Sequence, residues 1–375
     1  MIEDLQALVR MPTVSDTPAV RQAGAWLSRR LAFLGARLIP MSGPVVVAEL
    51  KGDPAAPTVL IYGHYDVVPA GPLDRWSVPP FGAVRTGRTL WGRGTSDDKG
   101  PVVAGLHAVE KLGATRVNLK FIYDGEEEIG SPTLSRSLGR MRAWLSDVDA
   151  VVVCDTNATP TGRPTLTRSL RGGISLDLVA TGTGRALHTG RYGGAAPDPA
   201  HAVARVVSAL DEPEGTSIVV TSLATNPADA RVIPATATAK LDVRMVSPQV
   251  PDRIANELAD HVKTACPPGI RLSIRSQIRS EPWQLRDFGH PMLRVACAAV
   301  KANWGVEPAF VRSGGSIPVV PLLATVAPKA ALLLLGFTLP SDGAHSVDEH
   351  VDLPRMFCAA ETLADLINRV GGERP

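Results

Sequence analysis

The chain has 375 residues, of which 45% are hydrophobic, a length comfortable for two domains and a content that predicts a sizeable core. It carries 39 basic against 37 acidic side chains, mixed along the chain with no basic block or acidic tail, which argues against a nucleic-acid partner. The 4 cysteines stand far apart without paired spacing, so we expect no disulfide framework and a reducing, cytoplasmic location.

The first half of the chain alternates helical and strand-like segments. The N-terminus carries acidic residues early and has no continuous apolar run, so no signal peptide is expected. Strand–helix alternation of this kind predicts an α/β fold with a mostly parallel sheet. Helices are predicted over 2–10, 18–34, 100–113 and 133–145, and strands over 36–41, 44–50, 58–63, 118–125 and 149–155.

The pattern changes near Arg171. Strand-like runs over 174–182, 217–223, 235–246 and 271–278 enclose helical segments over 198–211 and 250–265. This order, βαββαβ, is typical of a ferredoxin-like α+β fold with one open sheet face. We therefore predict an inserted second domain over residues 172–283, which interrupts a first domain made of residues 1–171 and 284–375.

The α/β pattern returns in the last part of the chain. Helices are predicted over 290–303 and 354–369, and a buried strand over 330–337. The apolar tract from Pro318 to Phe337 is broken by prolines into pieces too short to cross a bilayer, so no membrane partner is expected.

Polar side chains that could hold metal ions stand mostly where apolar runs give way to Gly- or Asp-rich turns. An α/β sheet presents groups to a crevice at such positions. Histidine and carboxylate without cysteine suit a hydrolytic zinc or similar divalent site better than a structural one. The candidates are His64 with Asp66, Asp97, Glu127 with Glu128, Asp155, and His345.

The H-x-D motif and the Asp97 loop suggest distinct roles. On extended backbone His64 and Asp66 point the same way, and a carboxylate can fix the second ring nitrogen of a metal-bound imidazole. One carboxylate can also bridge two cations about 3.5–4 Å apart, and we choose Asp97 for this role. The alternative is that Asp97 or Asp98 caps the helix that follows.

The three adjacent glutamates at 126–128 repel each other, so a cation or deep solvation must compensate. One can ligate a metal while its neighbour acts as general base on water. A solvated turn is the alternative. Asp155 and His345 would be unremarkable alone, so the hypothesis depends on the joint pattern.

The segments YGHYDVVPAG, WGRGTSDDKGP, GEEEIGS, CDT and DGAHS span nearly the whole chain. They resemble, in order, the dinuclear zinc family of aminoacylase, glutamate carboxypeptidase and carnosine dipeptidase. The resemblance implies a catalytic domain with two zinc ions (manganese or cobalt would also fit) and an inserted lid and dimerisation domain. It assigns His64 and Asp155 to one metal and Glu128 and His345 to the other.

Further roles follow from the same resemblance. Asp97 would bridge both metals, together with a water or hydroxide, and its peptide bond to Asp98 would be cis. Asp66 would orient His64. Glu127 would be the general base and would later protonate the leaving amine.

Other stretches resemble the dipeptidase branch. Leu187-His188-Thr-Gly resembles the lid motif whose histidine polarises the scissile carbonyl, often from the partner subunit of a homodimer. Gly314-Gly315-Ser316 resembles the loop that holds the substrate carboxylate, with backbone N–H groups and the Ser316 hydroxyl as donors, and Arg244 matches a lid arginine that reaches the same group.

Arg231 departs from the family, which usually has Asn or Thr before Val-Ile-Pro. It suggests either a preference for a substrate with an extra carboxylate or a changed lid pose.

The predicted activity is hydrolysis of a peptide bond next to a free carboxylate, as in a dipeptidase or carboxypeptidase. Deacylation of N-acyl amino acids is the alternative within the family, so the expected substrates are small peptides or N-acyl amino acids. A catalytically silent binding or assembly module is a third possibility.

Overall fold

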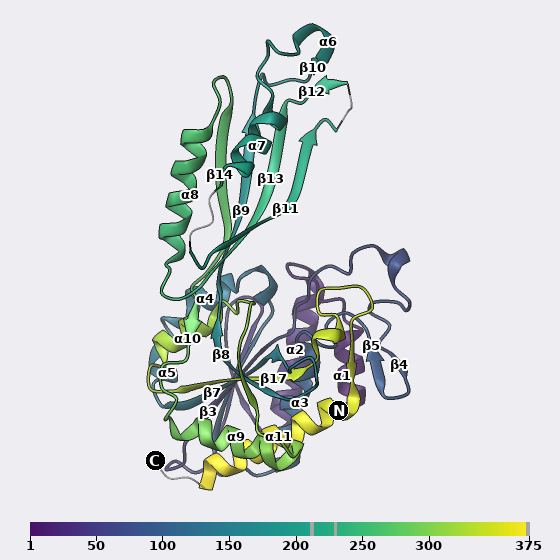
Figure 1. The fold of residues 1–375 in the computed structure, drawn as a ribbon. Coiled ribbons are helices and arrows are strands. Elements are labelled where there is room, and N and C mark those ends of the chain that lie inside the picture. Colours follow the sequence, from purple (N-terminus) through teal and green to yellow (C-terminus); the bar gives the residue numbers. More distant parts are fainter. Residues whose placement is uncertain (211–213, 229–230, 373–375) are drawn as a thin grey trace. The chain divides into compact units, whose positions relative to one another are not determined.

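A computed structural model describes residues 1–210, 214–228 and 231–372 (Figure 1). The chain divides into two compact units. The first consists of Met1–Ser169, Leu285–Ser313 and the chain from Val319 onward, and the second of Leu170–Gln284 and Gly314–Pro318.

The short segment Gly314–Pro318 groups with the second unit, although the prediction placed all of 284–375 in the first domain. Hydrogen bonds to Arg171 explain this difference. The Arg171 N–H donates to the Gly315 carbonyl at 3.1 Å, and the Ser316 hydroxyl donates to the Arg171 carbonyl at 2.6 Å.

The first unit is built on one large sheet whose strand order includes β1-β2-β6-β3-β7-β17-β8, with β16 paired to β8. Strands β6 (Asn118–Asp124), β3 (Thr58–His64), β7 (Val148–Asn157) and β17 (Ala331–Thr338) run parallel to one another. Every residue of β3 and β17 is buried, as expected for a parallel sheet covered on both faces. The predicted α/β fold with a mostly parallel sheet is confirmed.

The outer strands of this sheet add antiparallel pairs. Strands β2 (Val45–Leu50) and β1 (Arg37–Ile39) continue it beyond β6, and β8 (Thr165–Leu170) pairs antiparallel with β17. Strand β16 (Ala309–Arg312) runs parallel to β8.

Helices of the first unit share one hydrophobic core with the sheet. Helix α11 (Leu353–Gly372) packs on α3 (Lys99–Leu112) and α9 (Pro291–Trp304), while α1 (Ile2–Val9) contacts α3 and α2 (Pro18–Phe33) contacts β2. The prediction of one helix over 133–145 is wrong. Two short helices, α4 (Pro132–Leu138) and α5 (Arg142–Leu145), occupy this stretch, and α4 ends at the cap residue Gly139.

The apolar tract after Pro318 forms α10 (Val319–Val326) and then β17. Within residues 1–210, 214–228 and 231–372, no helix combines the length and hydropathy that a membrane crossing requires.

A small antiparallel sheet that the sequence pattern did not reveal connects a segment before α3 with the C-terminal part of the chain. It consists of β4 (Val84–Thr86), β5 (Thr89–Trp91) and β18 (His350–Asp352), in the order β18-β5-β4. Single turns of 3-10 helix, η1 (Leu73–Arg75), η2 (Glu127–Ile129) and η3 (Pro340–Asp342), lie in the connections.

The second unit has the predicted βαββαβ order. Its sheet, β11-β13-β9-β14, is antiparallel throughout. Helices α7 and α8 pack against strands of this sheet and form a separate core with them. The elements are β9 (Gly172–Thr181), α7 (Pro199–Ser208), β11 (Ser217–Asn226), β13 (Thr236–Met245), α8 (Pro251–Ala265), β14 (Arg271–Ser280) and β15 (Trp283–Gln284).

Two details of this unit differ from the prediction. Helix α7 ends at Ser208, whereas a helix over 198–211 was expected, and residue 211 lies outside the described residues. An additional two-stranded antiparallel sheet pairs β10 (Leu187–His188) with β12 (Val232–Ile233), and the short helix α6 (Thr189–Tyr192) follows β10.

Candidate metal centre

Four of the five candidate ligands lie at or after the carboxyl ends of neighbouring parallel strands, and the fifth, Asp97, lies in the loop between β5 and α3. His64 is the last residue of β3, Asp155 lies near the end of β7, and η2, which holds Glu128, follows β6. His345 lies in the connection after β17. Because β6, β3, β7 and β17 are adjacent and parallel, their carboxyl ends meet at one edge of the sheet.

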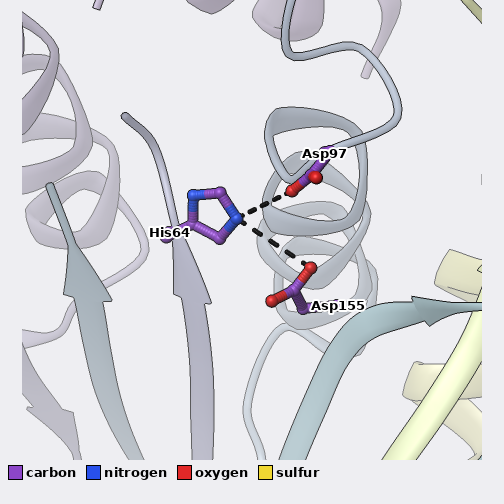
Figure 2. A group of neighbouring side chains, drawn as sticks. All are labelled: His64, Asp97 and Asp155. Atoms are coloured by element: carbon purple, nitrogen blue, oxygen red, sulfur yellow. Dashed lines mark hydrogen bonds and ion pairs between the residues drawn. The ribbon is translucent and has the colours of Figure 1, made fainter. Parts of the chain in front are cut away.

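The first group of side chains consists of His64, Asp97 and Asp155 (Figure 2). The His64 Nε2 atom lies 2.9 Å from Asp97 Oδ1 and 3.9 Å from Asp155 Oδ1. Figure 2 shows the imidazole pointing from its strand toward both carboxylates. This group is buried or nearly so.

The second group consists of Asp97, Glu128 and His345. The His345 Nε2 atom lies 3.1 Å from Asp97 Oδ2 and 3.1 Å from Glu128 Oε1. Asp97 therefore belongs to both groups and directs one carboxylate oxygen toward each.

The donor atoms fit divalent cations in type and spacing. Within each group they all lie within 4.8 Å of one another. Two ligands about 2.0–2.2 Å from a tetrahedral zinc ion lie about 3.3–3.6 Å apart, within the range of these contacts. Histidine and carboxylate donors without thiolate are also the set found in hydrolytic metal sites.

Asp66 is fully buried, and its carboxylate holds the turn after β6. Oδ1 accepts from the Glu127 N–H at 3.1 Å, and Oδ2 accepts from the Glu128 N–H at 3.2 Å and from the Ser15 hydroxyl at 2.7 Å. The His64 Nδ1 atom lies 3.4 Å from Asp66 Oδ1 and 3.1 Å from the Asp66 carbonyl. Asp66 thus contacts the imidazole and also fixes the backbone of both glutamates.

The Asp98 side chain holds the backbone of His64 and does not cap the helix that follows it. The Asp97–Asp98 peptide bond is cis, as the resemblance predicted. Asp98 occupies the N-cap position of α3, but its side chain does not cap the helix. Its Oδ2 atom accepts from the His64 N–H at 3.1 Å instead, so the capping interpretation of Asp98 is wrong because the carboxylate holds the end of β3.

The pKa values of the cluster reflect burial and mutual charge. Burial, together with Asp97, raises the pKa of Asp155 well above its ordinary value, and burial together with Glu128 does the same for Glu127. Burial opposes protonation of His64, but the Asp66 and Asp97 carboxylates raise its pKa.

The imidazole of His345 lies between Asp97 and Glu128, and these carboxylates raise its pKa to about 11. These shifts reflect how many carboxyl groups the fold gathers at this edge of the sheet.

In the second unit, His188 is exposed at the N-cap of α6. Its Nδ1 atom accepts from the Gly190 N–H at 3.1 Å. A neutral imidazole with Nδ1 as acceptor carries its hydrogen on Nε2, so Nε2 can donate.

Arg244 and Ser316 are joined within the second unit. The guanidinium donates from Nε to Asp242 Oδ2 at 2.9 Å and from Nη1 to the Ser316 hydroxyl oxygen at 3.0 Å. Because the Ser316 hydroxyl itself donates to the Arg171 carbonyl, its hydrogen is already engaged. Ser316 thus orients Arg244 through its oxygen.

Three supporting side chains were not found from the sequence, namely Ser15, Asp242 and Glu349, whose carboxylate accepts from the Asp97 N–H at 3.1 Å. Asp242 stands two residues before Arg244 on β13, a spacing that places both on one face and could have revealed it. Ser15 and Glu349 act through hydrogen bonds to distant segments, for which the sequence offers no local pattern.

The model of peptidase family M20/M25/M40 matches residues 60–369. The chain therefore belongs to this family of metal-dependent peptidases, and the predicted family is confirmed. The match covers most of the chain, including every candidate metal ligand.

Curated relatives resemble the chain over most of its length. The Cys-Gly metallodipeptidase DUG1 of Candida albicans is 27% identical, with 99% of this chain and 94% of the relative covered. The cysteinylglycine-S-conjugate dipeptidase of Corynebacterium striatum is 28% identical, with 91% and 88% covered.

Solved structures share the fold. The dipeptidase Dug1p from Saccharomyces cerevisiae superposes with a TM-score of 0.89 at 23% identity, covering 100% of this chain and 96% of that one. Human carnosine dipeptidase 1 superposes with a TM-score of 0.87 at 21% identity, covering 99% and 96%.

Proposed function

We propose that this enzyme is a dipeptidase that cleaves the peptide bond next to a free carboxylate with the help of two divalent cations. The observation that carries the proposal is the position of Asp97, whose two carboxylate oxygens face His64 on one side and His345 on the other. The names of the curated relatives, both dipeptidases acting on cysteinylglycine compounds, support the substrate class.

His64 and Asp155 would hold one cation, Glu128 and His345 the other, and Asp97 both. Zinc is the first choice because the donors are imidazole and carboxylate, although manganese or cobalt would also fit. Two such cations supply Lewis-acid activation of water and of the substrate carbonyl when bound.

Glu127 would act as the general base. Its backbone N–H is fixed by Asp66, and it is the immediate neighbour of Glu128, so its carboxylate belongs to the same edge of the sheet. It would accept a proton from the attacking water and deliver it to the nitrogen of the leaving amine.

Residues of the second unit would bind and polarise the substrate. His188 would donate from Nε2 to the carbonyl oxygen as negative charge develops there, either in its own subunit or from a partner. Arg244, held by Asp242 and Ser316, would pair with the substrate carboxylate, and the loop Gly314-Gly315-Ser316 would contribute backbone donors.

Arg231 would favour a substrate with an additional carboxylate. It is exposed, and its carbonyl accepts from the Thr189 N–H at 3.4 Å and from the Thr189 hydroxyl at 3.2 Å, immediately beside His188. Arg231→Ala should then lose discrimination between acidic and neutral dipeptides in kcat/KM. Unchanged discrimination would favour the other hypothesis, a changed lid pose.

The second unit would also be the lid and the dimerisation unit. Strand β11 is an edge strand in the described part of the chain, paired there with β13. Apolar side chains on it are exposed, with Val219 at 52% and Leu223 at 62%. A second copy of the chain could cover this edge, since an exposed apolar edge strand favours association. Analytical ultracentrifugation of Leu223→Lys against the unaltered protein tests this, and identical monomeric profiles would contradict it.

The enzyme would work in the cytoplasm. All four cysteines are free thiols in the structure. Free cysteines without disulfides are typical of a reducing compartment. Fractionation of the source cells with an antibody against the protein would test this, and recovery outside the cytoplasm would contradict it.

The test of the main proposal is hydrolysis of a substrate panel by apo protein reloaded with zinc, manganese or cobalt. The panel contains Cys-Gly, β-Ala-His, acidic dipeptides, longer peptides and N-acyl amino acids. Dipeptides should give the highest kcat/KM. Preference for N-acyl amino acids would indicate a deacylase, and metal-replete protein that cleaves no amide bond would refute the proposal.

Glu127→Ala serves as the matched variant in that experiment. It should retain both metal ions, since Glu127 is not one of the proposed ligands, and lose turnover by about 10²–10⁴-fold. Near-normal turnover would show that another group is the base.

A further inference from the structure

The carboxylate of Glu349 is buried among donors from the loop that carries Asp97. Its side chain is 1% exposed. Oε1 accepts from the Ser96 N–H at 2.9 Å and from the Asp97 N–H at 3.1 Å, while Oε2 accepts from the Gly94 N–H at 2.9 Å and from Arg93 Nη1 at 2.7 Å. One carboxylate therefore accepts from three backbone N–H groups of the same short loop and from one guanidinium.

The same residue continues the segment that carries His345. Glu349 stands four positions after His345 and directly before β18, whose first residue, His350, is paired with Trp91. The Glu349 carbonyl also accepts from the Gly92 N–H at 2.8 Å. Main chain and side chain of Glu349 thus join the His345 segment to the Asp97 loop.

Burial of this charge is costly unless it is fully compensated. A buried carboxylate needs a counter-ion and hydrogen bonds to most of its lone pairs, and here Arg93 and the three N–H groups supply them. Replacement of a buried ion pair by apolar side chains is often neutral or stabilising. A gain in stability therefore does not by itself explain why Arg93 and Glu349 are paired here. Its geometric effect is to fix the backbone of Asp97.

We infer that Glu349 is a positioning residue that sets the Asp97 carboxylate against His345. The inference depends on the proposed metal-binding roles of Asp97 and His345. Side chains that orient metal ligands typically contribute about 10–100-fold to metal affinity. Glu349 would do so for a ligand that two cations share.

The experiment measures zinc binding by the full-length apo protein, using calorimetric titration with zinc chloride at a temperature where circular dichroism shows each variant folded. Glu349→Gln keeps the shape but turns an amide group toward one of the N–H donors. It should bind zinc about 10–100-fold more weakly than the unaltered protein.

A second variant separates positioning from stability. Glu349→Gln alone leaves the Arg93 guanidinium buried without a counter-ion, which can destabilise the fold. Arg93→Met combined with Glu349→Gln removes that charge, so thermal stability should recover while zinc affinity stays low. Zinc affinity equal to that of the unaltered protein in either folded variant would overturn the inference.

Asp352→Asn is the matched control. Asp352, the last residue of β18, forms an ion pair at 2.6 Å with Arg88, which lies in the turn between β4 and β5, and it accepts no N–H from the Asp97 loop. The Asp352→Asn variant should bind zinc as tightly as the unaltered protein. A loss of zinc affinity as large as that of Glu349→Gln would overturn the inference.

Asp97→Ala in the same titration distinguishes the two levels of the argument. If Asp97→Ala binds zinc as the unaltered protein does, the proposed metal centre fails, and the role of Glu349 fails with it. If Asp97→Ala loses zinc while folded Glu349→Gln keeps it, only the role of Glu349 is refuted.

Discussion

The two groups of candidate ligands differ in how the fold presents them. In the first, the His64 side chain is 1% exposed and stands at the end of a buried central strand. In the second, the His345 side chain is 53% exposed and lies in a connecting segment with φ of 63°. One group is set by the sheet itself, whereas the other depends on turns.

This difference explains where the additional carboxylates stand. Strand ends are positioned by the ladder of the sheet, and the backbone of His64 is held further by its N–H bond to Asp98. The turn with Glu128 is held by Asp66, and the segment with His345 is joined to the Asp97 loop by Glu349. Acidic side chains thus provide at the exposed group the order that the sheet provides at the buried one.

Asp97→Ala should have the largest effect on both groups of ligands, because it removes the carboxylate that they share. We expect zinc content to fall from two ions per chain toward none, and turnover to fall by at least about 10³-fold since both cations contribute to the reaction. Mass spectrometric metal analysis after gel filtration measures the first effect and dipeptide hydrolysis the second. Retention of two ions would show that Asp97 is not shared.

Substitution of the two histidines, one at a time, tests the difference between the buried group and the exposed group. His64→Ala leaves a cavity in a buried site and should lower the free energy of unfolding of the apo protein by about 2 kcal/mol or more. His345→Ala should change it by less than about 1 kcal/mol, because the side chain is half exposed.

Each variant should still lose zinc at its own group. Urea unfolding of the apo proteins and zinc titration together provide the measurement. Equal losses of stability would contradict the distinction between a group set by the sheet and one set by turns.

Asp66→Asn tests how the turn that carries Glu127 and Glu128 is held. An amide cannot accept from Ser15 and from both N–H groups of Glu127 and Glu128, so the turn should loosen. We expect kcat/KM to fall by about 10–100-fold at saturating zinc, with a smaller effect on the stability of the apo protein. Unchanged kinetics would show that the turn holds its geometry without this carboxylate.

Sequence patterns predicted the elements whose burial is continuous and whose length is ordinary. Strands β3, β6 and β7 appear as apolar runs, and the strand ends that follow them identify His64, Glu128 and Asp155. The small sheet β18-β5-β4 could not be predicted, since three-residue strands have no measurable periodicity. The break between α4 and α5 was missed because helical periodicity continues across it.

The supporting residues of the site could be predicted least. Glu349 and Ser15 act on backbone or side-chain groups hundreds or tens of residues away, and only the folded chain brings them there. Arg93, which pairs with Glu349, is buried as well, although arginine is usually a surface residue. Most candidate metal ligands follow strand ends of the large sheet, whereas the residues that hold them depend on the three-dimensional arrangement of the loops.

Ser15→Ala is the smallest expected change. It removes one of the three hydrogen bonds that Asp66 accepts and leaves those from Glu127 and Glu128 in place. A hydrogen bond of this kind contributes about 1 kcal/mol net, so kcat/KM should fall only about fivefold. Ser28→Ala, which removes a hydroxyl bonded to the Gly24 carbonyl within α2, is the matched control and should leave kcat/KM unchanged. If Ser15→Ala costs as much as Asp66→Asn, the hydroxyl rather than the two backbone donors determines how Asp66 is held, and the turn with Glu127 and Glu128 is ordered from the N-terminal segment.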